Sequence, residues 1–597
     1  MRTADYVFRY LADFGVREVF MLSGGGAMFL NDALGSEKRI RPVCTHHEQG
    51  AAIAAEGYAR TTGSLAVVSV TTGPGGTNTL TGVIGEWLDS QPVLYISGQV
   101  KFPTTVASCP ELPLRQLGDQ EINIVDIVRP VTKYAKMVTD PAMIRYELEK
   151  AIGIALSGRK GPVWLDIPIN VQSAEIDPDD LPAYEEAPES VPAITADAVD
   201  AVMASLRKAA APVIVAGQGI RLGGGVEPFR RLVERWKIPV LGTFNGFDLL
   251  PDCSPYSIGR AGTIGTRAGN LALQNADWVL CIGTRNNIRQ ISYNYENFAR
   301  RAKELIVVDI DGAELRKKTV RPTLPVHGDA REFLEKMLAT SERVALPDWS
   351  GWLEWNRRRK ERYPVVLPEY RDAAPGLNPY FFMEVLTVCL PENAVVSCTN
   401  ATPSLALFQA GTVKENQRMF ANSGCAAMGF GLPAALGAAA AVRGERPVIC
   451  LEGDGSLMMN LQELQTIRHH NFPVKLFLFD NNEYCSIRQT QDSFFEGRHT
   501  GCDNGSGVTF PDWRGIAAAF GWKYCRIDSA ANLAGEVERI LAEPGPVFCD
   551  VVLTPGYRFA PKLSSRRLPD GSIVSPSLED MFPFLPPEEM KENIYEL

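Results

Sequence analysis

The chain has 597 residues, 45% of them hydrophobic and 22% charged, a composition that is typical of globular proteins and excludes collagen-like or largely disordered chains. Its 60 basic and 70 acidic residues give a net charge of −10, so we expect no nucleic-acid partner, because phosphate binding needs a basic face. No apolar run approaches the roughly 18 residues that span a bilayer, and the first 20 residues favour an amphipathic helix over a signal peptide. We therefore expect a cytoplasmic protein without membrane contact.

Along the chain, short β-branched runs alternate with helical stretches in three blocks, the pattern of parallel sheets covered by helices. The first block covers residues 1–172, and a linker rich in proline and acidic residues follows over 173–194. The second block covers 195–345 and is followed by a charged connector over 346–376. The third covers 377–555, and a tail rich in proline, serine and charge covers 556–597. The sequence predicts an α/β chain of three doubly wound parallel-sheet domains.

The most specific chemical pattern lies in the third block, where Asp454 and Asn481 each follow the end of a predicted strand. The carboxyl ends of parallel strands meet at one edge of a sheet, so the two side chains can converge on one cation. A carboxylate, an amide oxygen and a nearby carbonyl suit Mg²⁺ that is bound together with a diphosphate. Either motif alone, GDG or NN, is ordinary turn chemistry. The residues between them predict one helix, from the spacing of Leu457, Leu461, Leu464 and Ile467.

GDG and NN at this separation resemble the thiamine diphosphate binding motif, and the chain from Thr3 to about Pro555 resembles the acetolactate synthase group of thiamine diphosphate enzymes. The three blocks then correspond to a pyrimidine-binding domain, a central FAD-type domain and a diphosphate-binding domain. The resemblance implies that Mg²⁺ is bound by Asp454, Asn481 and the backbone carbonyl of Glu483. It also implies that the diphosphate is bound by Gly453, Gly455 and Ser456.

The first block carries the other half of the implied site. Glu48, in HHEQGA, matches the family glutamate that hydrogen-bonds N1′ of the aminopyrimidine, a catalytic role that needs a carboxyl group kept protonated or sharing a proton in a dry site. Taken alone, Glu48 would be read as a carboxylate stabilised by a helix dipole, and only the GDG and NN motifs make the catalytic role the preferred one. Gln120 matches the catalytic glutamine near the reacting carbon, although its type also suits a surface residue. Further cofactor contacts are implied for Gly24, Gly25, Thr72, Gly73, Ala426 and Met428.

Met428 matches the large apolar residue that supports the bent cofactor, although a lone methionine is more often part of a core. Glu48 and Asp454 lie in different domains, so one cofactor must be held at a domain or subunit interface. The family places the cofactor between subunits, and we therefore expect a homodimer or homotetramer.

Segments of the second block resemble those that hold FAD in acetolactate synthases. The corresponding residues are Gly217, Gly219, Gly262, Thr263, Arg285, Asp309 and Asp311. Glycines permit close backbone approach to a pyrophosphate, Arg285 can pair with a phosphate, and an aspartate after a strand can bind ribose hydroxyls. A single GQG is weak evidence, and many relatives keep this domain without flavin. FAD is nevertheless the expected third cofactor, beside thiamine diphosphate and Mg²⁺.

Three departures from acetolactate synthases surround the substrate rather than the cofactor. The segment 22–26, LSGGG, replaces a Tyr-Pro-Gly-Gly turn, Ile169 replaces a lysine, and Thr490 replaces a tryptophan that shapes the choice of acceptor. We therefore predict a carboligase that decarboxylates a 2-oxo acid, preferably pyruvate, and transfers the acyl-anion equivalent to a bulky carbonyl acceptor such as a nucleotide-linked keto sugar. The tail residues Lys562, Arg566 and Arg567 could meet an anionic acceptor or form a solvated charged loop.

Other functions remain compatible with the same residues. The first is acetolactate synthase, in which a second pyruvate is the acceptor. The second is a flavin-containing 2-oxo acid oxidase, or a hydrolase in which water takes the acyl group. A non-catalytic regulatory or scaffold protein is a further alternative, and the presence of Glu48, Asp454 and Asn481 together argues against it.

Overall fold

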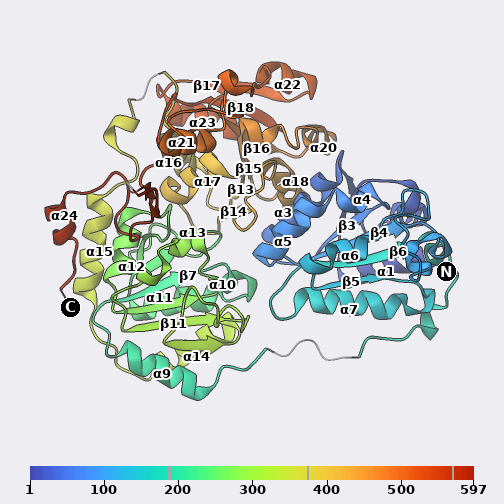
Figure 1. Cartoon of the computed structure of the whole chain (residues 1–597), viewed down its shortest axis with the longest axis horizontal. Coiled ribbons are helices and arrows are strands. Elements are labelled where there is room, and N and C mark those ends of the chain that lie inside the picture. Colours follow the sequence, from blue (N-terminus) through green and yellow to red (C-terminus); the bar gives the residue numbers. More distant parts are fainter. Residues whose placement is uncertain (186–190, 373–374, 568–569, 597) are drawn as a thin grey trace.

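The protein is described by a computed structural model that covers residues 1–185, 191–372, 375–567 and 570–596. Figure 1 shows three α/β units, with the first domain in blue, the second in green and the third in orange. Each unit contains one six-stranded sheet in which every pair of neighbouring strands is parallel. The prediction of three parallel-sheet α/β domains is confirmed.

In the first domain the sheet order is β2-β1-β3-β4-β6-β5. Its strands read as continuous apolar runs because helices cover both faces, and all five residues of β3 are buried. The strands are β1 (Glu18–Met21), β2 (Arg41–Cys44), β3 (Ala66–Val70), β4 (Val93–Gln99), β5 (Tyr134–Met137) and β6 (Val163–Pro168). The helices are α1 (Thr3–Phe14), α2 (Met28–Ser36), α3 (Glu48–Thr62), α4 (Pro74–Thr77), α5 (Leu80–Asp89), α6 (Ile124–Val128), α7 (Ile144–Leu156) and α8 (Ile169–Gln172).

In the second domain the order is β12-β11-β10-β7-β8-β9, and the central strand β10 is buried along its whole length. The strands are β7 (Pro212–Ala216), β8 (Val240–Gly242), β9 (Ser257–Arg260), β10 (Trp278–Ile282), β11 (Glu304–Asp309) and β12 (Leu324–His327). The helices are α9 (Ala196–Leu206), α10 (Gly219–Leu222), α11 (Val226–Trp236), α12 (Arg267–Asn275), α13 (Ile288–Ile291), α14 (Ala330–Ser341) and α15 (Ser350–Arg362).

In the third domain the order is β14-β13-β15-β16-β18-β17. The strands are β13 (Val395–Cys398), β14 (Arg418–Ala421), β15 (Val448–Gly453), β16 (Val474–Asp480), β17 (Lys523–Ile527) and β18 (Val547–Val552). The helices are α16 (Pro379–Cys389), α17 (Ala401–Ala410), α18 (Gly431–Val442), α19 (Asp454–Leu457), α20 (Glu463–His469), α21 (Cys485–Phe494), α22 (Trp513–Ala519) and α23 (Leu533–Ala542). The tail adds β19 (Arg566–Arg567), β20 (Ile573–Val574) and α24 (Pro587–Glu592).

One sequence prediction about this domain is wrong. The single helix expected between Asp454 and Asn481 is divided into α19 and α20, with a turn between them. Asn460, in that turn, is buried and donates its side-chain amide to the carbonyl of Gly429 at 2.7 Å. A buried amide that bonds outside its own helix competes with the helical ladder, and the leucine spacing alone did not reveal it.

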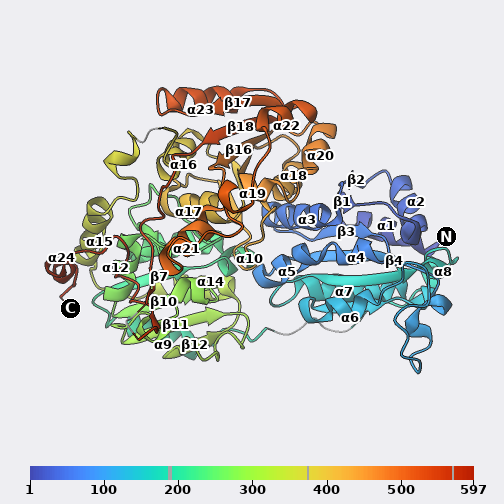
Figure 2. The same cartoon turned by 45° about the horizontal axis from the view of Figure 1, so that its top comes forward.

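The first and third domains are joined through α3 and α18, which lie side by side in both cartoon views (Figures 1 and 2). Both helices are rich in alanine and glycine. A Cβ atom on Gly57 would collide with the backbone of Ala434, and one on Gly437 would collide with the carbonyl of Ala54. The two backbones therefore approach closely only because these positions carry no side chain.

A buried polar cluster joins all three domains. The Arg60 guanidinium forms ion pairs with Glu56 at 2.7 Å and with Asp89 at 2.6 Å, within the first domain. The Asp89 carboxylate also accepts the Asn245 amide of the second domain, at 3.4 Å, and the Ser423 N–H of the third, at 3.0 Å. Buried charges need such partners, so this cluster fixes how the three domains meet.

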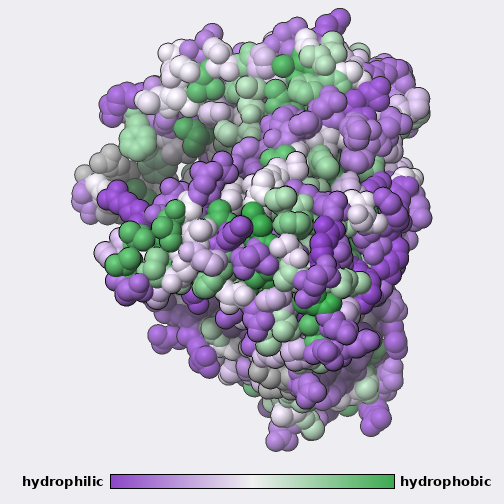
Figure 3. Space-filling model, turned by 90° about the vertical axis from the view of Figure 1, so that its right-hand side faces the viewer, coloured by the Kyte–Doolittle hydropathy of each residue, from purple (hydrophilic) through white to green (hydrophobic). Residues whose placement is uncertain are grey.

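No helix among the described residues is both long and apolar enough to cross a membrane. The face of the molecule on the first-domain side is largely hydrophilic, with small apolar patches between the charged groups (Figure 3).

The contact between α3 and α18 yields a stability prediction. Gly437→Ala should lower the free energy of unfolding by about 1–3 kcal/mol, because an extra methyl group overpacks a closed interface. Gly153→Ala, in the middle of α7 with no atom near the added methyl group, should be neutral or stabilising by up to about 1 kcal/mol. Urea denaturation measures both, and equal midpoints for the two variants would contradict the role of Gly437.

Candidate active site

A buried carboxylate lies at the carboxyl edge of the third sheet, where β15 ends and α19 begins. Asp454 is 4% exposed and accepts hydrogen bonds from the N–H groups of Gly455 at 2.7 Å, Asn481 at 3.1 Å and Asn482 at 2.6 Å. Burial raises the pKa of Asp454 to about 7, and the nearby carboxylate of Asp480 contributes to that increase. A cation at this position would stabilise the charged form that burial disfavours.

Asn481 follows the neighbouring strand β16, so the structure brings it to Asp454 as predicted from the motifs. Its amide nitrogen donates to the Tyr557 hydroxyl at 2.7 Å, and its amide oxygen accepts the Glu483 N–H at 3.2 Å. The Glu483 carboxylate pairs with Arg488 at 2.5 Å, which leaves the backbone carbonyl as the group of this residue suited to a metal. A carboxylate, an amide oxygen and a carbonyl fit Mg²⁺.

The turn predicted to bind a diphosphate is tightly packed on one side. A Cβ atom on Gly455 would collide with the ring of Tyr484, whereas one on Gly453 would make only an ordinary contact with Ser456, at 4.0 Å. The Ser456 hydroxyl lies 2.5 Å from the Thr399 hydroxyl and accepts the Gly429 N–H at 2.7 Å. These contacts fix the turn at the start of α19, the segment predicted to bind the diphosphate.

The predicted residues Ala426 and Met428 lie on the loop before α18. Both are half-buried, and Ala426 adopts a left-handed backbone conformation with φ of 54°. Asn400 donates its side-chain amide to the Ala426 carbonyl at 2.9 Å, and the side chain of Asn422 accepts the Ala426 N–H at 3.1 Å. The loop thus has a defined shape at Ala426, two residues before Met428.

In the first domain, Glu48 is the first residue of α3 and is 7% exposed. Its carboxylate accepts the side-chain amide of Asn78 at 3.0 Å. Gln120 lies over the turn at Gly73, where a Cβ atom would collide with the Gln120 carbonyl. Gly73 has φ of 63°, and Gln120 itself is exposed with φ of 60°.

The two glycine-rich turns of the first domain pack against each other. A Cβ atom on Gly24 would collide with the Thr71 side chain, and the Gly26 N–H donates to the Thr71 hydroxyl at 3.0 Å. Gly25, by contrast, faces open space.

The Gln99 side chain connects the second of these turns to the segment that carries Gln120. Its amide oxygen accepts the Thr72 hydroxyl at 2.6 Å, and its amide nitrogen donates to the carbonyl of Ile122 at 3.0 Å and to Asp166 at 3.1 Å. Burial raises the pKa of Asp166 to about 7. The sequence analysis missed Gln99 and Asp166, because no local motif shows that they meet this turn, and it missed Asn78, whose partner Glu48 lies 30 residues away.

Among the described residues, no contact within the chain joins Glu48 to Asp454 or its hydrogen-bond partners. The hydrogen-bond partners of Glu48 and of Asp454 belong to their own domains. From the third domain, Glu463 contacts the segment just before α3, where its carboxylate accepts the His46 N–H at 3.1 Å.

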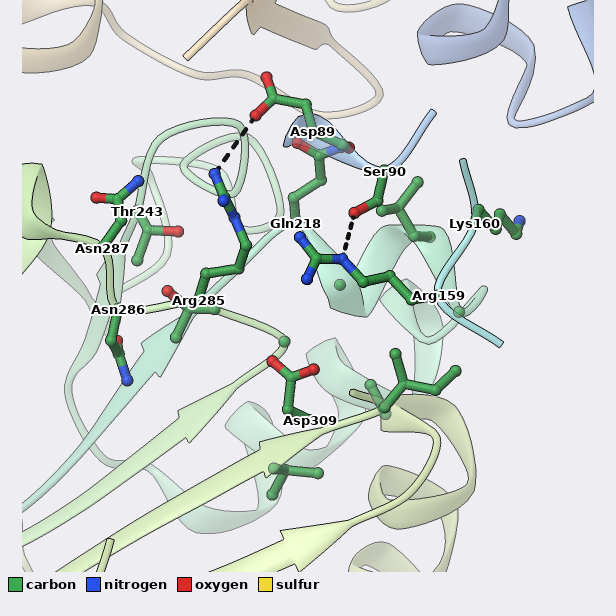
Figure 4. A pocket seen from close by; sticks show the side chains of 18 of the residues that line it. Asp89, Ser90, Arg159, Lys160, Gln218, Thr243, Arg285, Asn286, Asn287 and Asp309 are labelled. Atoms are coloured by element: carbon green, nitrogen blue, oxygen red, sulfur yellow. Dashed lines mark hydrogen bonds and ion pairs between the residues drawn. The ribbon is translucent and has the colours of Figure 1, made fainter. Parts of the chain in front are cut away.

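A cavity of about 510 Å³ lies where the second domain meets the other two (Figure 4). Of the seven residues predicted to bind FAD, Gly219, Arg285 and Asp309 line it. The Arg285 guanidinium points to Asp89 at 3.8 Å, and burial raises the pKa of Asp309 to about 6. The cavity is therefore lined by a cation and a carboxylate from the expected segments.

The other predicted residues lie around this cavity. Asp311 lines an adjoining cavity and pairs with Arg159 at 2.9 Å. Gly217 packs against Gly283 under the cavity floor, and Thr263 donates its hydroxyl to the Arg289 carbonyl at 2.7 Å. Gly262, beside Thr263, has φ of 132°.

The first domain also supplies two cationic residues to the cavity, and the sequence analysis missed both. The Arg159 guanidinium donates to the Ser90 hydroxyl at 3.0 Å, as Figure 4 shows, and Lys160 has a pKa lowered by burial. They lie in the SGRKGP turn before β6, about 35 residues before the second domain begins in the sequence, so only the fold brings them there.

Comparison with known proteins identifies the family. "Thiamine pyrophosphate enzyme, N-terminal TPP binding domain" matches residues 1–126, "Thiamine pyrophosphate enzyme, central domain" matches 199–337, and "Thiamine pyrophosphate enzyme, C-terminal TPP binding domain" matches 402–551. The chain belongs to the thiamine pyrophosphate enzymes.

Curated relatives match this thiamine pyrophosphate enzyme along nearly its whole length. The acetolactate synthase large subunit of Lactococcus lactis is 31% identical and covers 94% of both chains. The acetolactate synthase isozyme 1 large subunit of Escherichia coli is 32% identical, over 92% of this chain and 93% of its own. A probable acetolactate synthase large subunit of Methanocaldococcus jannaschii is also 32% identical, over 93% and 92%. The predicted thiamine diphosphate enzyme of the acetolactate synthase type is confirmed.

The positions that depart from acetolactate synthases have ordinary structural partners in this enzyme. Ile169 begins α8, and the side chain of the next residue, Asn170, accepts the Phe102 N–H at 2.8 Å. Thr490 is exposed on α21 and donates its hydroxyl to the Ser486 carbonyl at 3.0 Å. Lys562 is half-buried, whereas the side chains of Arg566 and Arg567 lie outside the described residues.

Proposed function

We propose that this thiamine pyrophosphate enzyme decarboxylates pyruvate and joins the two-carbon unit to a second pyruvate, as an acetolactate synthase. The proposal rests on the Asp454–Asn481 cluster and Glu48 in a chain that aligns almost end to end with proteins named acetolactate synthase. These relatives favour a second pyruvate over the nucleotide-linked keto sugar that we expected as the acceptor.

For the cofactors, we propose that Asp454, Asn481 and the carbonyl of Glu483 hold Mg²⁺ and that the turn from Gly453 to Ser456 binds the diphosphate. The three oxygen donors and the raised pKa of Asp454 support a divalent cation there. Bound thiamine diphosphate supplies the carbanion and the electron sink for decarboxylation and acyl transfer.

Within this scheme Glu48 holds and moves a proton at the pyrimidine ring, and Gln120 orients the reacting carbonyl. Glu48 is buried at the start of α3 and is oriented by Asn78. Gln120 is held near the Thr72–Gly73 turn by the hydrogen bonds of Gln99. Because the partners of Glu48 and Asp454 lie in separate domains of one chain, we propose a homodimer or homotetramer in which each cofactor is bound between two subunits.

A second candidate acceptor is a bulky carbonyl compound such as a nucleotide-linked keto sugar. The exposed Thr490 supports it, because a threonine leaves more space than the tryptophan of acetolactate synthases. Acetyl transfer that is slow with pyruvate alone and is accelerated by such an acceptor would favour this candidate over acetolactate synthase.

The proposed function predicts that the purified enzyme with Mg²⁺ and thiamine diphosphate converts pyruvate into CO₂ and acetolactate. Glu48→Gln should lower kcat by about 10²–10⁴-fold, because the variant cannot exchange a proton with the pyrimidine. The exposed Glu111 supplies the control Glu111→Gln, which should keep the activity. CO₂ release and product mass measure both steps, and no decarboxylation of pyruvate or any other 2-oxo acid would contradict the proposal.

We also propose that the central cavity holds FAD, with Arg285 at a phosphate and Asp309 at the ribose. Arg285→Gln should weaken flavin binding by about 10–100-fold, because a hydrogen bond between charged groups contributes about 1.5–3 kcal/mol. Arg207→Gln, an exposed change in the same domain, is the control. Flavin absorbance after gel filtration measures the bound fraction, and wild-type enzyme that binds no added FAD would contradict this assignment.

A further inference from the structure

We propose that Tyr557, a residue of the C-terminal tail, is a positioning residue that turns the amide oxygen of Asn481 toward the metal. This inference rests on the proposed Mg²⁺ site. It assigns a function to the start of the tail, whereas the sequence analysis considered only the charged tail residues Lys562, Arg566 and Arg567, as contacts for an anionic acceptor.

Tyr557 is 7% exposed, and its hydroxyl lies between two side chains of the third domain. It is 2.7 Å from the amide nitrogen of Asn481 and 2.6 Å from the hydroxyl of Thr402. An amide N–H can only donate, so the phenol oxygen must accept from Asn481. The phenol O–H is then free to donate to Thr402.

This pairing fixes the orientation of the Asn481 amide. With the nitrogen directed to Tyr557, the oxygen is directed to the other side, where it accepts the Glu483 N–H at 3.2 Å and keeps a second lone pair for a cation. A flipped amide would place two N–H groups at the cation and its oxygen at the phenol. Tyr557 and the Glu483 N–H therefore select the same rotamer.

The tail backbone is held where it passes this site. The Gln489 side chain donates to the Tyr557 carbonyl at 3.1 Å and accepts the Phe559 N–H at 3.4 Å. Further along, the Leu563 N–H donates to the Thr263 carbonyl of the second domain at 2.7 Å. The tail thus crosses from the third domain to the second, and Tyr557 occupies a defined position on that path.

The test is Tyr557→Phe, which removes the hydroxyl and keeps the ring. We expect the apparent Kd for Mg²⁺, titrated at a fixed thiamine diphosphate concentration and followed by tryptophan fluorescence, to rise by about 10–100-fold, as for other groups that orient metal ligands. Activity should recover at high Mg²⁺. The control is Tyr524→Phe, whose hydroxyl lies 2.7 Å from Asp550 in the same domain, and it should leave the Mg²⁺ titration unchanged.

The outcomes separate this inference from the proposed function. If wild-type enzyme binds neither Mg²⁺ nor thiamine diphosphate, the proposed site itself is wrong. If the wild type binds both and Tyr557→Phe has the same Mg²⁺ affinity, Tyr557 does not position Asn481. Should Tyr557→Phe fail to fold, Tyr557→Leu makes the same test, because it also removes the oxygen that accepts from the Asn481 amide. That variant should also weaken Mg²⁺ binding, and an unchanged affinity would overturn the inference.

Discussion

The close contact of α3 with α18 is the constraint that fixes, within one chain, the spacing of the two halves from which we propose the sites are built. Gly57 and Gly437 allow the two backbones to meet, so the first and third domains are held at one spacing. α3 begins with Glu48, and α18 follows the loop that carries Met428. A shift between these helices would therefore change how one chain presents Glu48 and the Met428 loop to the two sites that we propose it shares with a partner, and the dry packing at the contact resists such a shift.

The central domain is joined to this pair through Asp89. Its carboxylate bonds to Arg60, Asn245 and Ser423, and it also faces Arg285 at the wall of the central cavity. Ser423 lies on the loop that holds Ala426 and Met428. Asp89 and Ser423 both line the central cavity, so this cavity adjoins the loop that we propose supports thiamine diphosphate.

Much of this organisation was predictable from the sequence. Buried strands read as continuous apolar runs, and GDG and NN follow two adjacent strands, so the sheets and the Asp454–Asn481 pair could be predicted from local patterns. Other features depend on the tertiary structure. Tyr557, Arg159 and Gln99 lie far along the sequence from the residues that they contact, and no local motif predicts those contacts. The helix after Asp454 is divided by Asn460, whose partner Gly429 lies 31 residues away along the chain.

The central claim is that one cofactor is shared by Glu48 of one subunit and the Asp454 cluster of another. The most direct test mixes two inactive variants, Glu48→Gln and Asp454→Ala, after co-refolding or co-expression. If the site lies between subunits, mixed dimers contain one intact site, and random pairing restores about a quarter of the wild-type activity. If each chain builds its own site, the mixture stays inactive, and that result would contradict the account.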